Sequence, residues 1–529
     1  MERNIERVPV SHGGLGFGSR RGASSHQHNP FVILAEKETT EKYGGCWGMS
    51  FLYSGNFWFE AEKDQFEQTR MQMGILPEMF EYPLAPGERF YSPEVAMAYT
   101  DEGLAKLSHI YHELIRRHVC RGKFRDIRRP VLINNWEATY FDFTGSQILD
   151  IARQAAELGV EMFVLDDGWF GKRDNEDAGL GDWAANEKKI GMSLSALSEK
   201  IHDMGMKFGL WIEPEMVNED SELFRKHPDW AFRIPGRMPV MGRNQLTLDF
   251  SRKEVVDHIF EQISGNLEKA RIEYIKMDMN RSINDVYTAV NGCQNFGEIM
   301  HRYVLGVYDF LERLTTRFPD LLVEGCCGGG GRFDAGMLYY TPQIWCSDDT
   351  DAIERIYIQN GTSFGYPISA VGSHVSAVPN HQTGRTVSLH TRAVVAMSGS
   401  FGYELDLNTL TEKEKEEVRG QIRAYKENWE LLHEGRYYRL TDLCAHPDAA
   451  AWSFVSRDRE EMLLNIVNIN VHANAPVSYI RCMGLLPEKM YKVQETGKMF
   501  SGAALMTVGF PVPVVMGEYN AWQYHFICV

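Results

Sequence analysis

Between Pro130 and about Leu410 the chain alternates short apolar runs with longer helical stretches, and this alternation restricts the fold more than any other feature. Repeated strand–helix units build a parallel sheet covered by helices, which favours an α/β fold with a central (β/α)8 TIM barrel. A doubly wound open sheet is the competing architecture, but its glycine fingerprint is absent after the first strand. The expected strands are Val131–Asn134, Met162–Leu165, Phe208–Ile212, Tyr274–Met277, Leu321–Glu324 and Gln343–Cys346, with weaker candidates near Ile368–Val371 and Val395–Phe401.

The segments on either side of this region have different patterns. Near the N-terminus, Phe51–Tyr53 and Asn56–Glu60 are predicted strands around a turn signal. Apolar residues from Leu104 to Ile115 recur at helical spacing, and Glu412–Leu431 is predicted to be one charged helix. Further strands are expected at Leu463–Asn468 and Pro511–Val515. The predicted parts are a partial N-terminal β-sandwich (1–100), a helical linker (101–129), the barrel (130–435) and a C-terminal antiparallel β-domain (436–529).

The net charge restricts which partners the chain is expected to bind, and the cysteine pattern indicates its cellular compartment. The 55 Lys and Arg residues against 72 Asp and Glu give a net charge of −17, so neither nucleic acid nor an anionic membrane is an expected partner. Met1–Glu6 begins no signal peptide, and no run of about 18 apolar residues predicts a membrane span. The nine cysteines are scattered, which favours a reducing cytoplasm over a disulfide framework.

No cofactor and no metal are predicted. Cys326 and Cys327 are adjacent, which is poor spacing for a tetrahedral zinc site. Gly328–Gly331 is followed by Arg332 and lacks the Gly-Lys-Ser/Thr ending of a phosphate loop. Glycines after a strand also let the backbone approach a ligand closely, and this interpretation fits the run better.

Carboxylates and tryptophans follow the predicted strands. The strand ends carry Asn135-Trp136-Glu137, Asp166-Asp167-Gly168-Trp169, Trp211 to Glu215, Asp278 to Arg281, Glu324 to Cys327, and Ser347-Asp348-Asp349. In a barrel these ends converge on one rim, where tryptophan faces can stack on a sugar ring and carboxylates can accept its hydroxyl hydrogens. The competing interpretation is a helix N-cap for any single aspartate and core packing for Trp169 or Trp183.

Two aspartates on this rim are candidates for the chemistry. Lys276 and Asp278 lie two residues apart on a strand and therefore share a face. The lysine charge would lower the pKa of Asp278 and keep it ionised, as a nucleophile needs, although a structural salt bridge is the alternative. Asp348 lies two strands further, where an ionised Asp278 would raise its pKa and favour an acid role.

Together these segments resemble glycoside hydrolase family 36, the bacterial α-galactosidases. The matching stretches lie in collinear order and span most of the chain. They are Ser19 to Pro30, Asn134 to Asp142, Leu165 to Gly171, Trp211 to Val217, Gly242 to Gln245, Lys276 to Arg281, Gly328 to Asp334 and Ser347 to Ala352.

The resemblance implies a retaining α-galactosidase that hydrolyses terminal α-galactosyl residues of galacto-oligosaccharides. It implies that Asp278 is the nucleophile and Asp348 the general acid/base. The implied lining of the galactose pocket is Trp136, Asp166, Asp167, Trp211, Arg243, Lys276, Asn280, Cys326 and Gly328. The family uses no redox or metal cofactor for its chemistry and often forms tetramers, so a homo-oligomer is expected.

The chain departs from the family pattern in two places. Met277 stands where the family usually has tryptophan, and strand alternation turns it away from the catalytic face. The family's N-terminal β-sandwich also begins roughly two hundred residues earlier. We therefore expect missing strands, exposed apolar side chains, lower solubility, weaker activity and doubtful tetramer formation. The side chains expected to be exposed are Phe51, Tyr53, Phe57 and Phe59.

Three other functions stay open on sequence grounds. α-N-acetylgalactosaminidase and galactosyltransferase activities occur among relatives, and the space around Cys326 to Gly328 would decide the first. From another class, the chain could be an inactive sugar-binding remnant. Both Asp278 and Asp348 are present, which disfavours the remnant.

Overall fold

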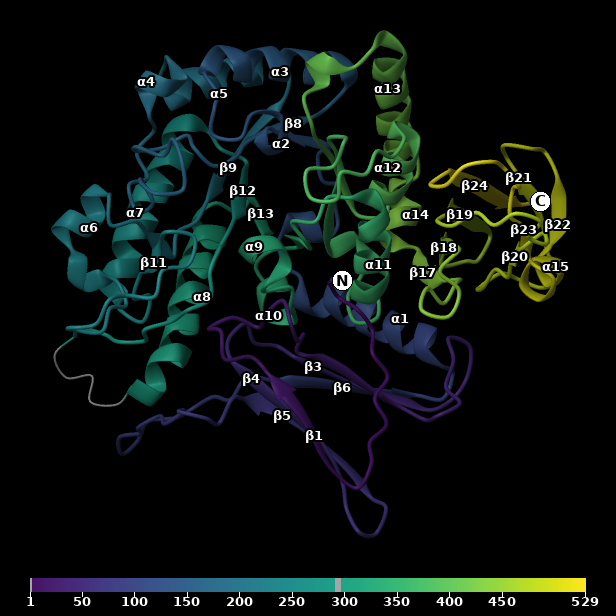
Figure 1. Ribbon diagram of the computed structural model, residues 1–529, viewed down its shortest axis with the longest axis horizontal. Coiled ribbons are helices and arrows are strands. Elements are labelled where there is room, and N and C mark those ends of the chain that lie inside the picture. Colours follow the sequence, from purple (N-terminus) through teal and green to yellow (C-terminus); the bar gives the residue numbers. More distant parts are fainter. Residues whose placement is uncertain (1, 291–295) are drawn as a thin grey trace.

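A closed barrel of eight parallel strands forms the centre of the computed structural model, which describes residues 2–290 and 296–529. The barrel strands are β7 (Leu132–Asn134), β8 (Met162–Leu165), β9 (Lys207–Ile212), β12 (Tyr274–Met277), β13 (Leu322–Gly325), β14 (Gln343–Trp345), β15 (Val371–Ser376) and β16 (Ser400–Glu404). Helices lie around the strands (Figure 1). This closure confirms the predicted (β/α)8 barrel.

The last two barrel strands lie further along the chain than predicted. β15 begins at Val371, where the predicted strand ended, and the prediction at Val395–Phe401 falls mainly on α12 (Leu389–Ala396) and the turn before β16. α12 is buried along most of its length. A short apolar run in a buried helix cannot be distinguished from a buried strand by periodicity alone.

The long covering helices follow the predicted periodicity. α3 (Gly145–Leu158) begins at a capping box, in which the Thr144 side chain accepts from the Gln147 N–H while the Gln147 side chain binds the Thr144 N–H. α7 (Lys253–Ala270) buries Val255, Ile259 and Ile263 on one face. The charged helix is two helices, α13 (Glu412–Glu427) and α14 (Trp429–Glu434).

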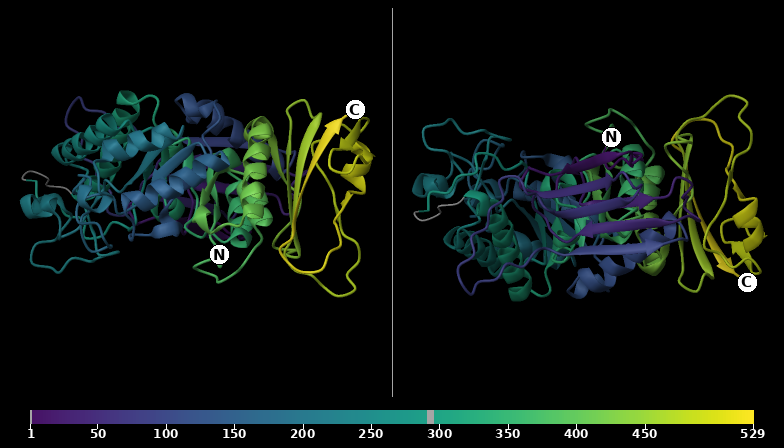
Figure 2. Two further views of the ribbon diagram at one scale, coloured as in Figure 1. Left: turned by 90° about the horizontal axis from the view of Figure 1, so that it is seen from above. Right: turned by 90° about the horizontal axis from the view of Figure 1, so that it is seen from below.

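Two three-stranded antiparallel sheets lie against the barrel on the N-terminal side. They are β1 (Gly13–Gly18), β4 (Phe57–Lys63) and β5 (Thr69–Ile75), and β2 (Phe31–Ala35), β3 (Cys46–Phe51) and β6 (Val95–Thr100). Seen from below, their strands extend across one side of the barrel (Figure 2).

The predicted exposure of four aromatic side chains in these sheets is wrong. Phe51, Tyr53, Phe57 and Phe59 are between 0 and 5% exposed. They form a shared core between the two sheets, closed by Val304 of α8 (Ile299–Arg317). The barrel helix therefore covers apolar surface that the sequence pattern alone left without a partner.

The C-terminal part is a six-stranded antiparallel sheet with a core of its own. Its order is β17 (Arg436–Arg439), β18 (Ala449–Val455), β19 (Glu461–Asn468), β24 (Ala521–Cys528), β21 (Met490–Val493) and β22 (Met499–Ser501). Figure 1 shows this sheet beside the barrel, next to α12 and α14. The strand predicted at Pro511–Val515 reduces to the two-residue β23 (Phe510–Pro511), since prolines cannot donate to a sheet. Within the described residues, every helix is too short or too polar to cross a membrane.

Two histidines, the half-buried His109 and the buried His433, join segments that are distant in sequence. The Nε2 of His109 on α1 (Leu104–Leu114) donates to the Tyr437 carbonyl at 2.8 Å, and that of His433 donates to the Arg125 carbonyl at 2.9 Å. Burial lowers the pKa of each imidazole to about 4, so both are neutral near pH 7.

Acid is therefore expected to weaken the fold between pH 6.5 and 4. Across this window the unfolded chain binds a proton at His109 and His433 and the folded chain does not. The free energy of unfolding should fall with pH by on the order of 1 kcal/mol per unit for each histidine. Urea unfolding of His433→Gln, which keeps an N–H donor, should show a shallower pH slope. The exposed His472→Gln is the control, and equal slopes in both variants would refute the assignment.

Candidate active site

Asp278 lies directly after β12, and its carboxylate accepts four hydrogen bonds. One oxygen, Oδ1, accepts from the backbone N–H groups of Met279 and Gly328, each at 2.8 Å. The other accepts from Asn280 Nδ2 at 2.8 Å and from Trp211 Nε1 at 3.2 Å. Hydrogen bonds of this kind favour the charged carboxylate and fix its orientation.

The pKa of Asp278 is lowered despite its burial. Burial acts to raise it, but the positive charge of Lys276 and the N–H donors of Gly328 and Met279 outweigh that effect. The direct ion-pair partner of Lys276 is Asp166, whose Oδ2 lies 3.0 Å from Nζ. The predicted effect of the lysine on Asp278 is thus present, but it acts without a direct salt bridge between the two.

Asp348 follows β14 and has a different environment. Its Oδ1 accepts from Trp345 Nε1 at 3.1 Å. The side chain is open to solvent, yet surrounding protein and the charge of Asp278 both disfavour ionisation and raise its pKa to about 6. The charge of Asp278 is the firmer cause, because an accessible carboxylate keeps part of its hydration. The two aspartates therefore have pKa values displaced in opposite directions.

A glycine turn brings the two aspartates together. The φ angles of Gly328, Gly329 and Gly330 are +56°, +75° and +86°, a region that side chains with a Cβ rarely adopt. Gly328 donates to Asp278, while a Cβ added to Gly329 would lie 3.0 Å from the Asp348 carboxyl carbon. The predicted close approach of glycine backbone at this strand end is therefore present.

Asp166 and Asp167 directly follow β8, and both are buried. Asp166 accepts from Asn134 Nδ2 at 2.5 Å in addition to its ion pair with Lys276. Asp167 forms a two-point ion pair with Arg173, with contacts of 2.8 and 3.0 Å. Each carboxylate is thus fixed by a cation while keeping acceptor capacity for a ligand.

The remaining predicted residues surround this centre at different depths. The exposed Arg243 pairs with Glu176 at 2.5 Å, and its charge also acts on Asp278. Cys326 is buried, and burial and the two catalytic candidates raise its thiol pKa well above the ordinary value. Trp136 opens α2 (Trp136–Thr139) after β7, three strands around the barrel from β12.

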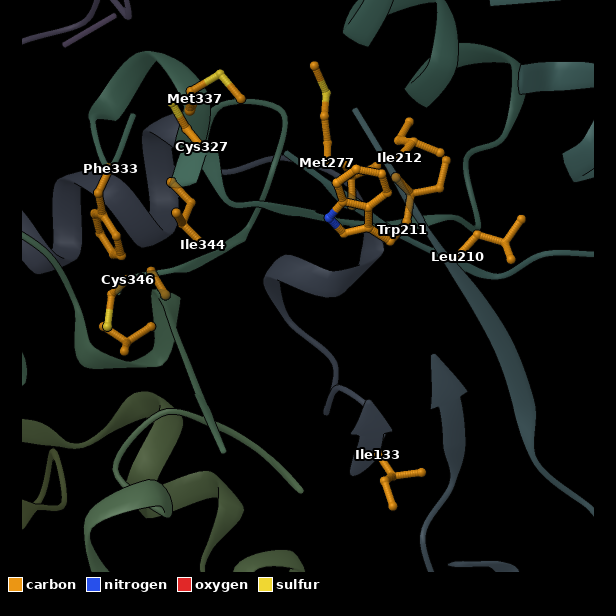
Figure 3. Packing of buried hydrophobic residues seen from close by; sticks show 14 of the residues in the cluster. Ile133, Leu210, Trp211, Ile212, Met277, Cys327, Phe333, Met337, Ile344 and Cys346 are labelled. Atoms are coloured by element: carbon orange, nitrogen blue, oxygen red, sulfur yellow. The ribbon is translucent and has the colours of Figure 1, made fainter. Parts of the chain in front are cut away.

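Met277, the departure from the family pattern, lies outside this polar group. It is fully buried and pairs in register with Ile212 of the neighbouring strand. Figure 3 shows both side chains within the apolar packing around the strands. The prediction that residue 277 packs behind the site is consistent with this position.

Besides Arg173, the acidic or basic side chains of Glu213, His374 and Glu404 lie near the centre and were not among the predicted site residues. Glu213 is fully buried, accepts hydrogen bonds from Gln245 and Asn280, and has its pKa raised to about 7 by burial and by Asp278. His374 lies within β15, Glu404 is the last residue of β16, and the two side chains pair at 3.0 Å. Glu213 lies in the matching stretch from Trp211 to Val217 and could have been found there, whereas the other two lie on the strands whose positions were predicted incorrectly.

A closed barrel with an ionised aspartate and a second, more basic carboxyl at its strand ends is the architecture of a glycoside hydrolase. The chain belongs to glycoside hydrolase family 36. The melibiase family model matches residues 89–435, and the models of the family's N-terminal and C-terminal domains match residues 1–85 and 449–526. The family predicted from the sequence motifs is thereby confirmed.

The similar proteins include several α-galactosidases. The chain is 58% identical over 526 residues to the bifunctional alpha-galactosidase/sucrose kinase AgaSK of Mediterraneibacter gnavus, covering 99% of this chain and 55% of that protein. It is 51% identical over 528 residues to alpha-galactosidase AgaA of Geobacillus stearothermophilus, covering 100% of this chain and 72% of AgaA. The chain thus spans about half the length of the first relative and nearly three quarters of the second.

Solved structures agree with the fold over nearly the whole chain. The galactosidase domain of AgaSK superposes with a TM-score of 0.97 at 57% identity, covering 100% of this chain and 72% of that chain. A variant of AgaA in complex with raffinose gives a TM-score of 0.97 at 49% identity, covering 99% of this chain and 73% of that chain.

Proposed function

We propose that this chain hydrolyses terminal α-galactosyl residues of galacto-oligosaccharides with net retention of configuration. The observation that carries the proposal is the pair of aspartates around one glycine turn, with the pKa of Asp278 lowered and that of Asp348 raised to about 6. The choice of an α-galactoside as substrate rests on the names of the relatives, and the choice of an oligosaccharide rests on the complex of the AgaA variant with raffinose.

In the proposed mechanism both aspartates take part in two successive displacements: Asp278 is the nucleophile and then the leaving group, and Asp348 is the acid and then the base. The Asp278 carboxylate attacks the anomeric carbon while protonated Asp348 gives its proton to the departing oxygen. This leaves a galactosyl ester on Asp278 and an anionic Asp348. Asp348 then removes a proton from water, which attacks the anomeric carbon and releases galactose and free Asp278.

The surrounding residues are proposed to bind the sugar. Asp166 and Asp167 hold neighbouring hydroxyls, since their cationic partners keep them ionised and in place. Trp211 and Asn280 fix the nucleophile through their N–H groups and border the ring. The other proposed binding residues are Trp136, Arg243, Lys276, Cys326 and Gly328.

The stereochemistry of the first product tests the proposal. NMR of the reaction with an aryl α-galactoside should show α-galactose first, with the β-anomer growing later by mutarotation. β-Galactose as the first product would contradict retention and require a carboxyl separation of about 6.5–9.5 Å in place of about 5–5.5 Å. A parallel assay with the aryl α-N-acetylgalactosaminide tests the alternative α-N-acetylgalactosaminidase activity.

Asp167→Asn is expected to lower kcat/KM for aryl α-galactosides about ten- to a hundredfold, because a charged hydrogen bond contributes about 1.5–3 kcal/mol. Asp166→Asn should behave similarly. The matched control is Asp150→Asn, an exposed carboxylate that pairs with Arg153 on α3. A crystal with galactose more than about 3.5 Å from both carboxylates would contradict the binding role. Thermal unfolding of Asp167→Asn shows whether the lost activity reflects weaker substrate binding or a fold destabilised by the unpaired Arg173 charge.

We also propose that the chain acts in the cytoplasm as a homo-oligomer. The described cysteines are unpaired, which fits a reducing compartment. Met97 and Tyr99 on β6 are 67% and 55% exposed and supply apolar surface for self-association. Light scattering of the purified chain tests the assembly, and a monodisperse monomer at micromolar concentration would contradict it.

A further inference from the structure

The glycine turn beside the two aspartates is held from outside the barrel by residues near the start of the chain. Of its backbone carbonyls, those of Gly328, Gly330 and Gly331 accept hydrogen bonds from the segment between residues 3 and 26. Figure 1 shows the start of the chain next to α9 (Cys327–Gly330), α10 (Ala335–Leu338) and α11 (Ala352–Thr362). The segment thus lies against the back of the site.

Arg3 forms the first of these attachments. Its Nη2 donates to the Gly330 carbonyl at 2.7 Å and its Nε to the Cys346 carbonyl at 3.3 Å. The guanidinium also lies 4.8 Å from the centre of the Phe333 ring. One side chain therefore joins the glycine turn to the strand end that carries Asp348.

Its neighbour reinforces the same attachment. The Glu2 carboxylate accepts a hydrogen bond from the Ser347 hydroxyl, one residue before Asp348. The backbone of Arg3 packs so closely on Gly361 of α11 that a Cβ at that glycine would overlap the Arg3 carbonyl oxygen. Gly361 is therefore a second point at which the attachment of Arg3 can be tested.

His26 and two serines form the second attachment. The Nε2 of His26 lies 2.6 Å from the Gly328 carbonyl oxygen and donates to it. The Ser25 N–H donates to the Gly331 carbonyl at 2.7 Å, and the Ser24 hydroxyl donates to the Asp334 carboxylate at 2.6 Å. These residues lie in the matching stretch from Ser19 to Pro30, to which the proposed reaction assigns no role.

The turn needs such support because its own conformation does not fix it. Its glycines lack a Cβ and have the largest backbone freedom of any residue. Yet the Gly328 N–H must point at Asp278 Oδ1, 2.8 Å away, and the Gly329 backbone must lie against Asp348. Bonds to the carbonyls of the same turn remove this freedom.

We propose that Arg3 and His26 are positioning residues, which hold the glycine turn where its Gly328 N–H meets Asp278. The inference rests on the proposed function, since it assigns a catalytic consequence to the hydrogen bond between Gly328 and Asp278. Neither residue touches the reacting atoms in this role. Each acts through the backbone of the turn.

The test compares Arg3→Ala with Arg7→Ala across pH. Arg7 lies on the same segment and donates to the Thr39 carbonyl, away from the turn. Loss of Arg3 should lower kcat/KM about tenfold and move its acid limb to higher pH, because a weaker Gly328 N–H bond raises the pKa of Asp278. Arg3→Lys should be intermediate, and Arg7→Ala should match the unmodified chain.

Two further pairs keep the proposal falsifiable if Arg3→Ala folds poorly. Gly361→Ala should expel Arg3 and reproduce its acid-limb shift, while Gly420→Ala, whose Cβ meets open space on α13, should not. His26→Ala should shift the limb and His28→Ala should not. An unchanged acid limb in both Arg3→Ala and Gly361→Ala would overturn the proposal.

Hydrogen exchange separates this inference from the proposed function. Amide exchange in the peptide that contains Gly328–Gly331 should accelerate in Arg3→Ala and stay unchanged in Arg7→Ala, whether or not the chain is active. Inactivity of the unmodified chain on all α-galactosides would contradict the proposed function, but the exchange rates of the Gly328–Gly331 peptide could still be measured and compared. Unchanged exchange in an active enzyme would defeat the positioning role alone.

Discussion

Asp278→Ala is expected to abolish turnover of every α-galactoside, with kcat reduced on the order of 10⁴-fold or more. The substitution removes the carboxylate that four donors hold in place and leaves no group to form the covalent ester. Initial rates with an activated aryl α-galactoside and with raffinose measure the loss.

Chemical rescue provides the positive control for this variant. Azide is small enough to enter the space left by the carboxylate, and with an activated aryl α-galactoside it should give β-galactosyl azide. The inverted product follows because only one displacement then occurs at the anomeric carbon. Near-normal kcat in Asp278→Ala, or an α-azide product, would be incompatible with a nucleophilic Asp278.

Asp348→Ala is expected to lower kcat/KM for raffinose about 10²- to 10⁴-fold, and much less for substrates with good aryl leaving groups. A basic departing oxygen needs the proton of Asp348, whereas an acidic phenol leaves without it. Asp348 must be protonated to act, so kcat/KM in the unmodified chain should fall as pH rises through the pKa of about 6. The variant should lack this alkaline limb.

The neighbouring carboxyl supplies the control for that experiment. Asp349→Asn changes a half-buried side chain one residue away and should keep both the leaving-group dependence and the alkaline limb. Comparison through kcat/KM reports the first displacement, even where the second limits kcat. Equal losses on aryl and natural substrates in Asp348→Ala would exclude the acid role.

The sequence predicted the barrel because most of its strands are short, mainly apolar and followed by polar residues. From Leu132 to Trp345 the predicted strands match to within one or two residues. β15 and β16 contain Ser373, His374 and Gly402 within their spans, so their pattern is weak. The neighbouring apolar helix α12 was mistaken for one of them, and the paired His374 and Glu404 were missed in consequence.

Contacts between side chains on different strands were harder to predict than the residues that form each strand. Alternation showed that Lys276 and Asp278 share a face, but not that Lys276 pairs with Asp166 on another strand. In the same way, the pattern around Phe57 showed an apolar face without showing that α8 covers it. Such contacts depend on tertiary packing, which no local periodicity contains.

The attachment of the glycine turn also affects how this protein folds. Arg3 and Gly330 are separated by 327 positions, and His26 and Gly328 by 302. Contacts of such high sequence separation carry a large loop-closure cost and form late. During synthesis Arg3 and His26 cannot make these contacts until the fifth strand of the barrel and its following turn have emerged. The proposed active site is thus completed by a segment that is synthesised before the barrel strands it contacts, and we expect the barrel to fold before the glycine turn is fixed.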